Sequence, residues 1–169
     1  MRILGIVVAT VVALALQTTL MRFLSGTTAV DLVLVVVVYV ALLFGPVTGL
    51  LTGTFAGLIQ DALSIGVIGI GGLAKTIVGF LAGVVGTQFI VSQAPSRFVV
   101  FFAATVLHAV IFMGLYELLG LRDFGTPYAQ VLGQAFTNAV VGTVAFQVAE
   151  LLPGAVDHAS PNGKLPHTA

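Results

Sequence analysis

The chain has 169 residues, of which 59% are hydrophobic, 7% are charged and none is cysteine, and its formal net charge is zero. A soluble domain carries about 25% charged residues, so this composition excludes a globular protein that is stable in water and indicates a multi-spanning integral membrane protein. The lack of cysteine excludes disulfides, thiolate metal sites and thiol catalysis, and the zero net charge argues against nucleic-acid partners and against polybasic attraction to anionic lipid.

The first predicted helix covers residues 3–21, which is close to the roughly 20 apolar residues that a membrane crossing needs. Its beginning also resembles a secretory signal peptide, because a charged N-terminus precedes an apolar run that contains Ala13 and Ala15 in an A-x-A pattern. The apolar run continues to Met21, and this length favours a first helix that is retained in the protein.

The second and third predicted helices cover residues 32–44 and 47–63 and are separated by Gly45-Pro46. Asp31 suits the start of the second helix, because a carboxylate accepts hydrogen bonds from the first N–H groups of a helix. Proline ends one helix and favours the start of the next. The valine run of the second segment would suggest a strand in water, but in lipid the backbone groups must be satisfied within a helix.

Glycines recur every fourth residue on the third predicted helix, and the spacing reappears on the fourth, residues 73–91. The glycines of this pattern are Gly45, directly before the third helix, then Gly49, Gly53 and Gly57, and on the fourth helix Gly79 and Gly83. Such a stripe lets another backbone approach closely, where packing and weak Cα–H contacts hold helices together. We expect tight packing inside one subunit, and a second interpretation stays open, in which the helix of a partner protein docks on the stripe.

A glycine-rich break, residues 64–72, predicts either a loop or a broken, re-entrant segment. Two more helices are expected over residues 98–119 and 128–152. The fold class is therefore an all-α integral membrane protein with about six transmembrane helices, in a membrane domain of residues 1–154.

A polar C-terminal tail, residues 155–169, is expected to be disordered. The numbers of positive charges at the two faces of the membrane are nearly equal, so the positive-inside rule gives only a weak orientation. The expected burial of Lys75 removes one positive charge from the face opposite the termini and so favours cytoplasmic termini.

Alternating spans place Asp61, Lys75 and Glu117 at the same face of the membrane. An ionisable group inside a span costs about 2.5–3.5 kcal/mol, so these side chains should face protein or water. We predict that Asp61 pairs with Lys75, with Glu117 as the rival partner of the lysine. Two other interpretations stay open: the three side chains reach the interface and only mark helix ends, or they handle a substrate or a proton.

Three polar residues lie at depth in the last two spans. His108 is expected to be a neutral imidazole bonded to a neighbouring helix rather than a proton carrier, and Gln134 and Asn138 are candidates for interhelical hydrogen bonds. The three histidines of the chain are scattered and predict no metal site. No nucleophile converges with a base, so the sequence predicts no enzyme and no cofactor.

A pattern of acidic, glycine and basic positions runs through the middle of the chain. It consists of an aspartate before a Val/Leu helix that ends in tyrosine, then Gly-Pro, a glycine stripe, Asp-x-Leu-Ser, and a lysine-containing helix with Gly-x-x-x-Gly. Its positions are Asp31, Tyr39, Gly45, Pro46, Gly57, Asp61, Leu63, Ser64, Gly69, Lys75, Gly79 and Gly83. This pattern resembles the rod shape-determining protein MreD family, in which the opening is often Pro-Asp where this chain has Val30-Asp31.

The resemblance implies a non-enzymatic scaffold in the bacterial inner membrane, which acts with an MreC-like bitopic protein, the RodA/penicillin-binding-protein synthase of peptidoglycan and, indirectly, an MreB-like filament. The six-helix layout of the family is similar to the substrate-binding subunits of energy-coupling-factor transporters. A membrane subunit that binds a vitamin-type small molecule is therefore the alternative. The residues expected to serve partner binding or structure are Asp61, Ser64, Lys75, Glu117, Gly49, Gly53, Gly57, Gly79 and Gly83.

Overall fold

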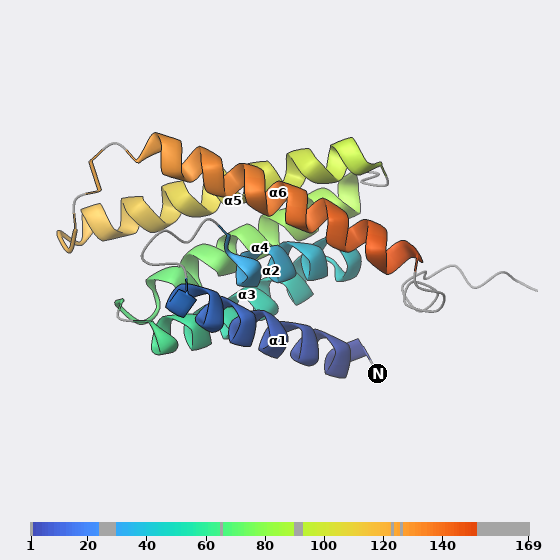
Figure 1. The fold of residues 1–169 in the computed structure, drawn as a ribbon, viewed down its shortest axis with the longest axis horizontal. Coiled ribbons are helices and arrows are strands. Elements are labelled where there is room, and N and C mark those ends of the chain that lie inside the picture. Colours follow the sequence, from blue (N-terminus) through green and yellow to red (C-terminus); the bar gives the residue numbers. More distant parts are fainter. Residues whose placement is uncertain are drawn as a thin grey trace, which may run out of the picture.

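The computed structural model describes residues 2–23, 30–64, 66–89, 93–122, 124–125 and 127–151. Over these residues the chain forms six α-helices: α1 (Arg2–Phe23), α2 (Leu32–Phe44), α3 (Pro46–Leu63), α4 (Ile70–Gln88), α5 (Ala94–Leu118) and α6 (Tyr128–Leu151). The helices lie roughly along the long axis of the molecule, with α5 and α6 on one side, α1 on the opposite side, and α2, α3 and α4 between them (Figure 1). The all-α fold class is confirmed.

The predicted helix boundaries agree most closely with the structure where local signals are strong. α2 begins and ends at the predicted residues, between Asp31 and Gly45. α4 begins at Ile70 rather than at residue 73, because Gly71 and Gly72 are drawn into the helix by packing against α3. The predicted disordered tail, like the domain boundary at its start, lies outside the described residues.

Four helices, α1, α4, α5 and α6, are long and apolar enough to cross a membrane. α2 has 13 residues, which at 1.5 Å per residue is about 20 Å and shorter than a hydrocarbon core of about 30 Å. α3 has 18 residues but is less apolar. Composition and length therefore establish membrane-crossing capacity for four of the six predicted spans.

The short helix α2 is the centre of the bundle and contacts all five other helices. Its side chains belong to two apolar clusters: Val33 and Val37 pack with α1 residues, and Leu34 and Val38 pack with residues of α4, α5 and α6. A helix that is hydrophobic all round is stable when it is covered all round. The two outermost helices, α1 and α6, both contact α2 but do not contact each other.

The glycine stripe lies at the interface between α3 and α4 of the same chain. A Cβ atom added to Gly53 would lie 2.7 Å from the carbonyl carbon of Lys75, and one added to Gly57 would lie 2.5 Å from Gly72 Cα. On α4, Cβ atoms at Gly79 and Gly83 would lie 2.8 Å from the carbonyl carbon of Gly49 and 2.5 Å from Pro46 N. The prediction of packing inside one subunit is confirmed. The alternative, a partner helix on the stripe, is wrong because α4 already occupies that face.

Candidate functional site

Asp31 lies immediately before α2 and uses its two carboxylate oxygens for two different contacts. Oδ1 accepts a hydrogen bond from the backbone N–H of Leu34 at 3.0 Å and so caps the helix, as predicted. Oδ2 lies 2.9 Å from Nζ of Lys75, on α4. Both side chains are buried. The same carboxylate therefore begins α2 and connects it to α4.

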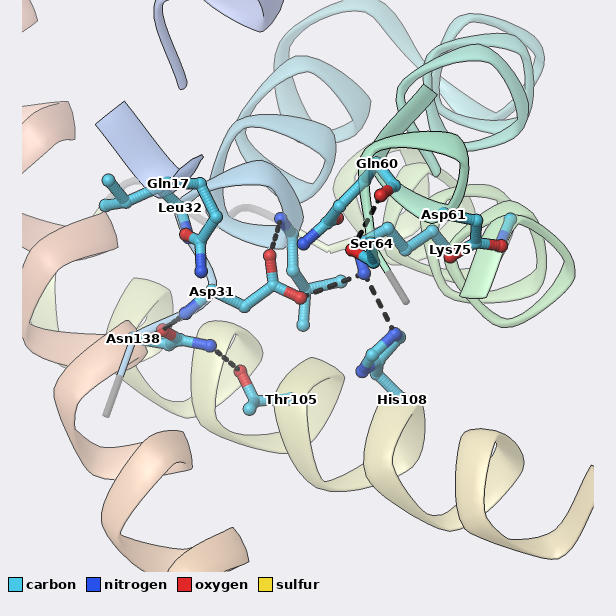
Figure 2. A network of polar contacts seen from close by, with 12 residues as sticks. Gln17, Asp31, Leu32, Gln60, Asp61, Ser64, Lys75, Thr105, His108 and Asn138 are labelled. Carbon is cyan, nitrogen blue, oxygen red and sulfur yellow. Dashed lines mark hydrogen bonds and ion pairs between the residues drawn. The ribbon is translucent and has the colours of Figure 1, made fainter. Parts of the chain in front are cut away.

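Lys75 also reaches His108, on α5, with 3.2 Å between Nζ and the ring Nε2. An ammonium group has three donors and no acceptor, so a charged Lys75 donates to Nε2 and leaves the ring proton on Nδ1. The expected contact between His108 and a neighbouring helix is confirmed. Lys75 thus stands between a carboxylate on one side and an imidazole on the other (Figure 2).

Asn138, on α6, is fully buried and bonds to two other segments. Its Oδ1 accepts from the backbone N–H of Asp31 at 2.9 Å, and its Nδ2 donates to Oγ1 of Thr105 on α5 at 3.2 Å. Figure 2 shows Asp31 between Asn138 and Lys75. The prediction of interhelical hydrogen bonding is confirmed for Asn138, whereas for Gln134 no such bond to another described residue is found.

Gln17 on α1 completes the arrangement, and the sequence analysis missed it. Its Nε2 donates to the carbonyl oxygen of Val30 at 3.0 Å, and its Oε1 accepts from the N–H of Leu32 at 2.8 Å. Both partners flank Asp31 in the backbone. Gln17 is the one amide side chain in the otherwise largely apolar first helix. Because an unpaired amide is unfavourable in lipid, its position could have predicted a hydrogen-bond partner inside the bundle.

These six side chains form what we call the Asp31 cluster: Gln17, Asp31, Lys75, Thr105, His108 and Asn138. All are between 0% and 8% exposed, and α1, α4, α5 and α6 each contribute to holding the start of α2. Positive and negative charge balance within the cluster, and its polar groups bond to one another or, for Gln17, to the backbone on either side of Asp31. No group of residues suited to a metal ion occurs in the part of the chain that the structure describes. The cluster is built to join helices.

The predicted pairing of Asp61 with Lys75 is wrong. Asp61 Oδ2 instead accepts from the backbone N–H groups of Gly69 and Gly72, both at 2.9 Å. Unsatisfied N–H groups and the positive end of the helix dipole make the start of α4 a favourable place for a carboxylate. Lys75, one turn further along α4, points into the bundle toward Asp31, so the two side chains face different surroundings.

The other two polar residues of the predicted set lie at the periphery. Ser64 is exposed, and its hydroxyl donates to the carbonyl oxygen of Gln60 at 2.7 Å. Glu117 is exposed near the end of α5, beside an open surface hollow that Gly120 and Arg122 also line. Glu117 is therefore not the partner of Lys75, whose Nζ contacts Asp31 and His108.

Replacement of Asp61 by alanine is expected to lower the free energy of unfolding by about 0.5–2 kcal/mol, the usual range for loss of a helix cap. The N–H groups of Gly69 and Gly72 would lose their acceptor, whereas Asp61→Asn keeps an acceptor oxygen and should lose less. Thermal unfolding of the purified variants in detergent measures both effects. A loss for Asp61→Asn as large as the roughly 3–5 kcal/mol expected when the cation of a buried ion pair is removed, as in Lys75→Met, would instead indicate that the charge of Asp61 is essential.

Comparison with known proteins adds one finding. A family model described as MreD, rod shape-determining protein MreD, matches residues 1–152. No curated protein and no solved structure matches the chain significantly. The expected likeness to substrate-binding subunits of energy-coupling-factor transporters is therefore not shown. The family match covers all six helices and every residue of the Asp31 cluster.

Proposed function

Because the chain belongs to the rod shape-determining protein MreD family, we propose that it is a non-enzymatic scaffold subunit of the bacterial cell-elongation complex. In this role it is a multi-pass protein of the inner membrane with cytoplasmic termini, and its short helix α2 is enclosed by the other helices. It binds an MreC-like bitopic protein and, through the complex, the RodA/penicillin-binding-protein synthase and an MreB-like filament.

The observation that supports a scaffold is the Asp31 cluster. Its charged and polar groups are buried and bonded to one another, so they stabilise one arrangement of five helices. A catalytic or transport site needs polar groups directed at a substrate. The two charged members, Asp31 and Lys75, are directed at each other. A rigid bundle is what a protein needs if it is to hold partners at fixed positions in the membrane.

The contact surface for the MreC-like protein must lie outside the interface between α3 and α4. Gly49, Gly53 and Gly57 are covered by α4, so they act inside the subunit and support the partner site indirectly by fixing the bundle. Many side chains of α1 are exposed, and among the described helices α1 contacts α2 and α3. The scaffold can therefore present much of its outer apolar surface to the helix of another protein without changing its own core.

Affinity purification of the tagged full chain from its native membrane in mild detergent, followed by mass spectrometry, tests this proposal. We expect an MreC-like bitopic protein and synthase subunits to be enriched relative to a purification of an unrelated polytopic membrane protein with the same tag. Recovery of an ATPase pair with a coupling subunit, and no shape-determining protein, would contradict the scaffold and support a substrate-binding subunit of a transporter.

A further inference from the structure

A cleft of about 240 Å³ lies at the end of α2 that is remote from the Asp31 cluster. Its lining includes Leu42 and Leu43 near the end of α2, Arg97 near the start of α5, and Glu150 near the end of α6. α2 ends at Phe44 after only 13 residues. Arg97 on α5 and Glu150 on α6 lie beside that end of α2 and line the cleft with it.

A buried cation and an exposed anion meet in this cleft. Arg97 is 5% exposed, and its Nη2 contacts Oε1 of Glu150, whose side chain is 47% exposed. The guanidinium carbon of Arg97 lies 4.6 Å from the ring centroid of Phe146, and the Tyr39 ring lies 4.3 Å from the same ring. The Phe146 ring, itself packed against Tyr39, lies against the buried guanidinium, while the carboxylate of Glu150 is exposed.

We propose that the cleft binds a phosphoethanolamine group, as carried by the headgroup of a zwitterionic membrane phospholipid. The phosphate would lie beside Arg97 and the primary ammonium on the exposed carboxylate of Glu150. The glycerol and the first methylenes of the chains would then lie against Leu42 and Leu43. This inference does not depend on the scaffold function proposed above.

Charge complementarity selects a zwitterion. A ligand that is only anionic would have to displace Glu150 from Arg97, and a ligand that is only cationic would compete with Arg97 for Glu150. A group with both charges presents an opposite charge to each residue, and hydrogen bonds between charged partners are the stronger ones. A primary ammonium donates to a carboxylate, whereas the trimethylammonium of a choline headgroup has no N–H to donate.

The size and place of the cleft agree with a headgroup rather than a complete small molecule. Pockets that enclose drug-sized ligands measure about 300–1,000 Å³, and this cleft measures about 240 Å³. It lies where α2, α5 and α6 begin or end, which in a membrane-crossing bundle is near the layer of lipid headgroups. Tyr39 is of the residue type that is enriched in that layer.

The test uses the purified full chain in discs of phosphatidylethanolamine, phosphatidylcholine or phosphatidylglycerol with the same acyl chains, with retained lipid measured by native mass spectrometry. We expect about tenfold preferential retention of phosphatidylethanolamine over phosphatidylcholine. Equal retention of the three lipids would overturn the proposal. A preference for phosphatidylglycerol would overturn it as well, because a lone anion would then displace Glu150.

The informative variant is Glu150→Gln, which keeps an oxygen that accepts from Arg97 but loses the charge that attracts an ammonium. The tenfold preference should disappear, whereas Gln147→Ala on the same exposed helix end should keep it. The unfolding midpoint in phosphatidylcholine discs checks that both variants fold. A preference that survives Glu150→Gln would overturn the site.

Free phosphoethanolamine identifies the source of the ligand. If the soluble compound raises the unfolding midpoint in phosphatidylcholine discs, and Glu150→Gln removes this shift, the headgroup site is supported with a soluble ligand. If only the phospholipid is retained, the site is supported as a lipid site.

Discussion

Replacement of Gly53 by leucine is expected to abolish the native packing of the bundle. A Cβ atom at this position would lie 2.7 Å from the carbonyl carbon of Lys75 and 3.0 Å from the backbone nitrogen of Thr76, both on α4. Backbone atoms in a helix cannot yield as a flexible side chain does. Overpacking a core typically costs about 1–3 kcal/mol and sometimes more, and leucine adds three further carbon atoms to the clash.

The effect should extend beyond the α3–α4 contact, because Lys75 would move with its helix. A shift of α4 away from α3 changes the distances from Lys75 to Asp31 and His108, the contacts that join α4 to the start of α2 and to α5. Since native proteins are stable by only about 5–15 kcal/mol, we expect Gly53→Leu to lose its cooperative thermal transition in detergent and to be cleaved rapidly by protease.

Gly133→Leu is the matched control. Gly133 lies on α6, is exposed, and has no atom within 4 Å of an added Cβ. Removal of a helical glycine there should be neutral or stabilise the helix by about 0.5–1 kcal/mol. If Gly53→Leu unfolds at the same temperature as Gly133→Leu, α3 and α4 do not pack through their glycines.

Lys75→Met is expected to lower the free energy of unfolding by about 3–5 kcal/mol. Methionine has a similar length but no charge, so the substitution leaves the Asp31 carboxylate buried without its cation. Removing one partner of a buried ion pair is costly because the remaining charge stays desolvated. Unfolding of the purified variant in detergent micelles, followed by circular dichroism, measures the loss.

The double variant Asp31→Asn/Lys75→Met tests whether the loss comes from this pair. Asparagine still accepts from the Leu34 N–H as a helix cap, so the double variant should recover part of the stability that Lys75→Met loses. Glu117→Gln, on the exposed end of α5, should change stability by no more than about 0.5 kcal/mol. Losses of the two single variants that simply add in the double variant would show that Asp31 and Lys75 do not interact.

Local signals explain which parts of the fold were predictable. The limits of α2 follow from a capping carboxylate before it and from Gly45-Pro46 after it, both of which act within a few residues of the helix end. Spacing on one helix also predicted that Gly49, Gly53 and Gly57 would meet another backbone closely. The identity of that helix depends on how the bundle assembles, and it is α4 of the same chain.

Composition, periodicity and chain direction were enough to predict the class of the protein, its six helices and the shared end at which Asp61 and Lys75 lie. Asp61 and Lys75 were correctly placed near the same end of the bundle. The side-chain partners could not be predicted in this way: in the folded chain Lys75 faces Asp31, while Asp61 caps α4. Depth follows from the count of residues in each span, but the direction in which a side chain points depends on the rotation of its helix, and packing against neighbouring helices sets that rotation.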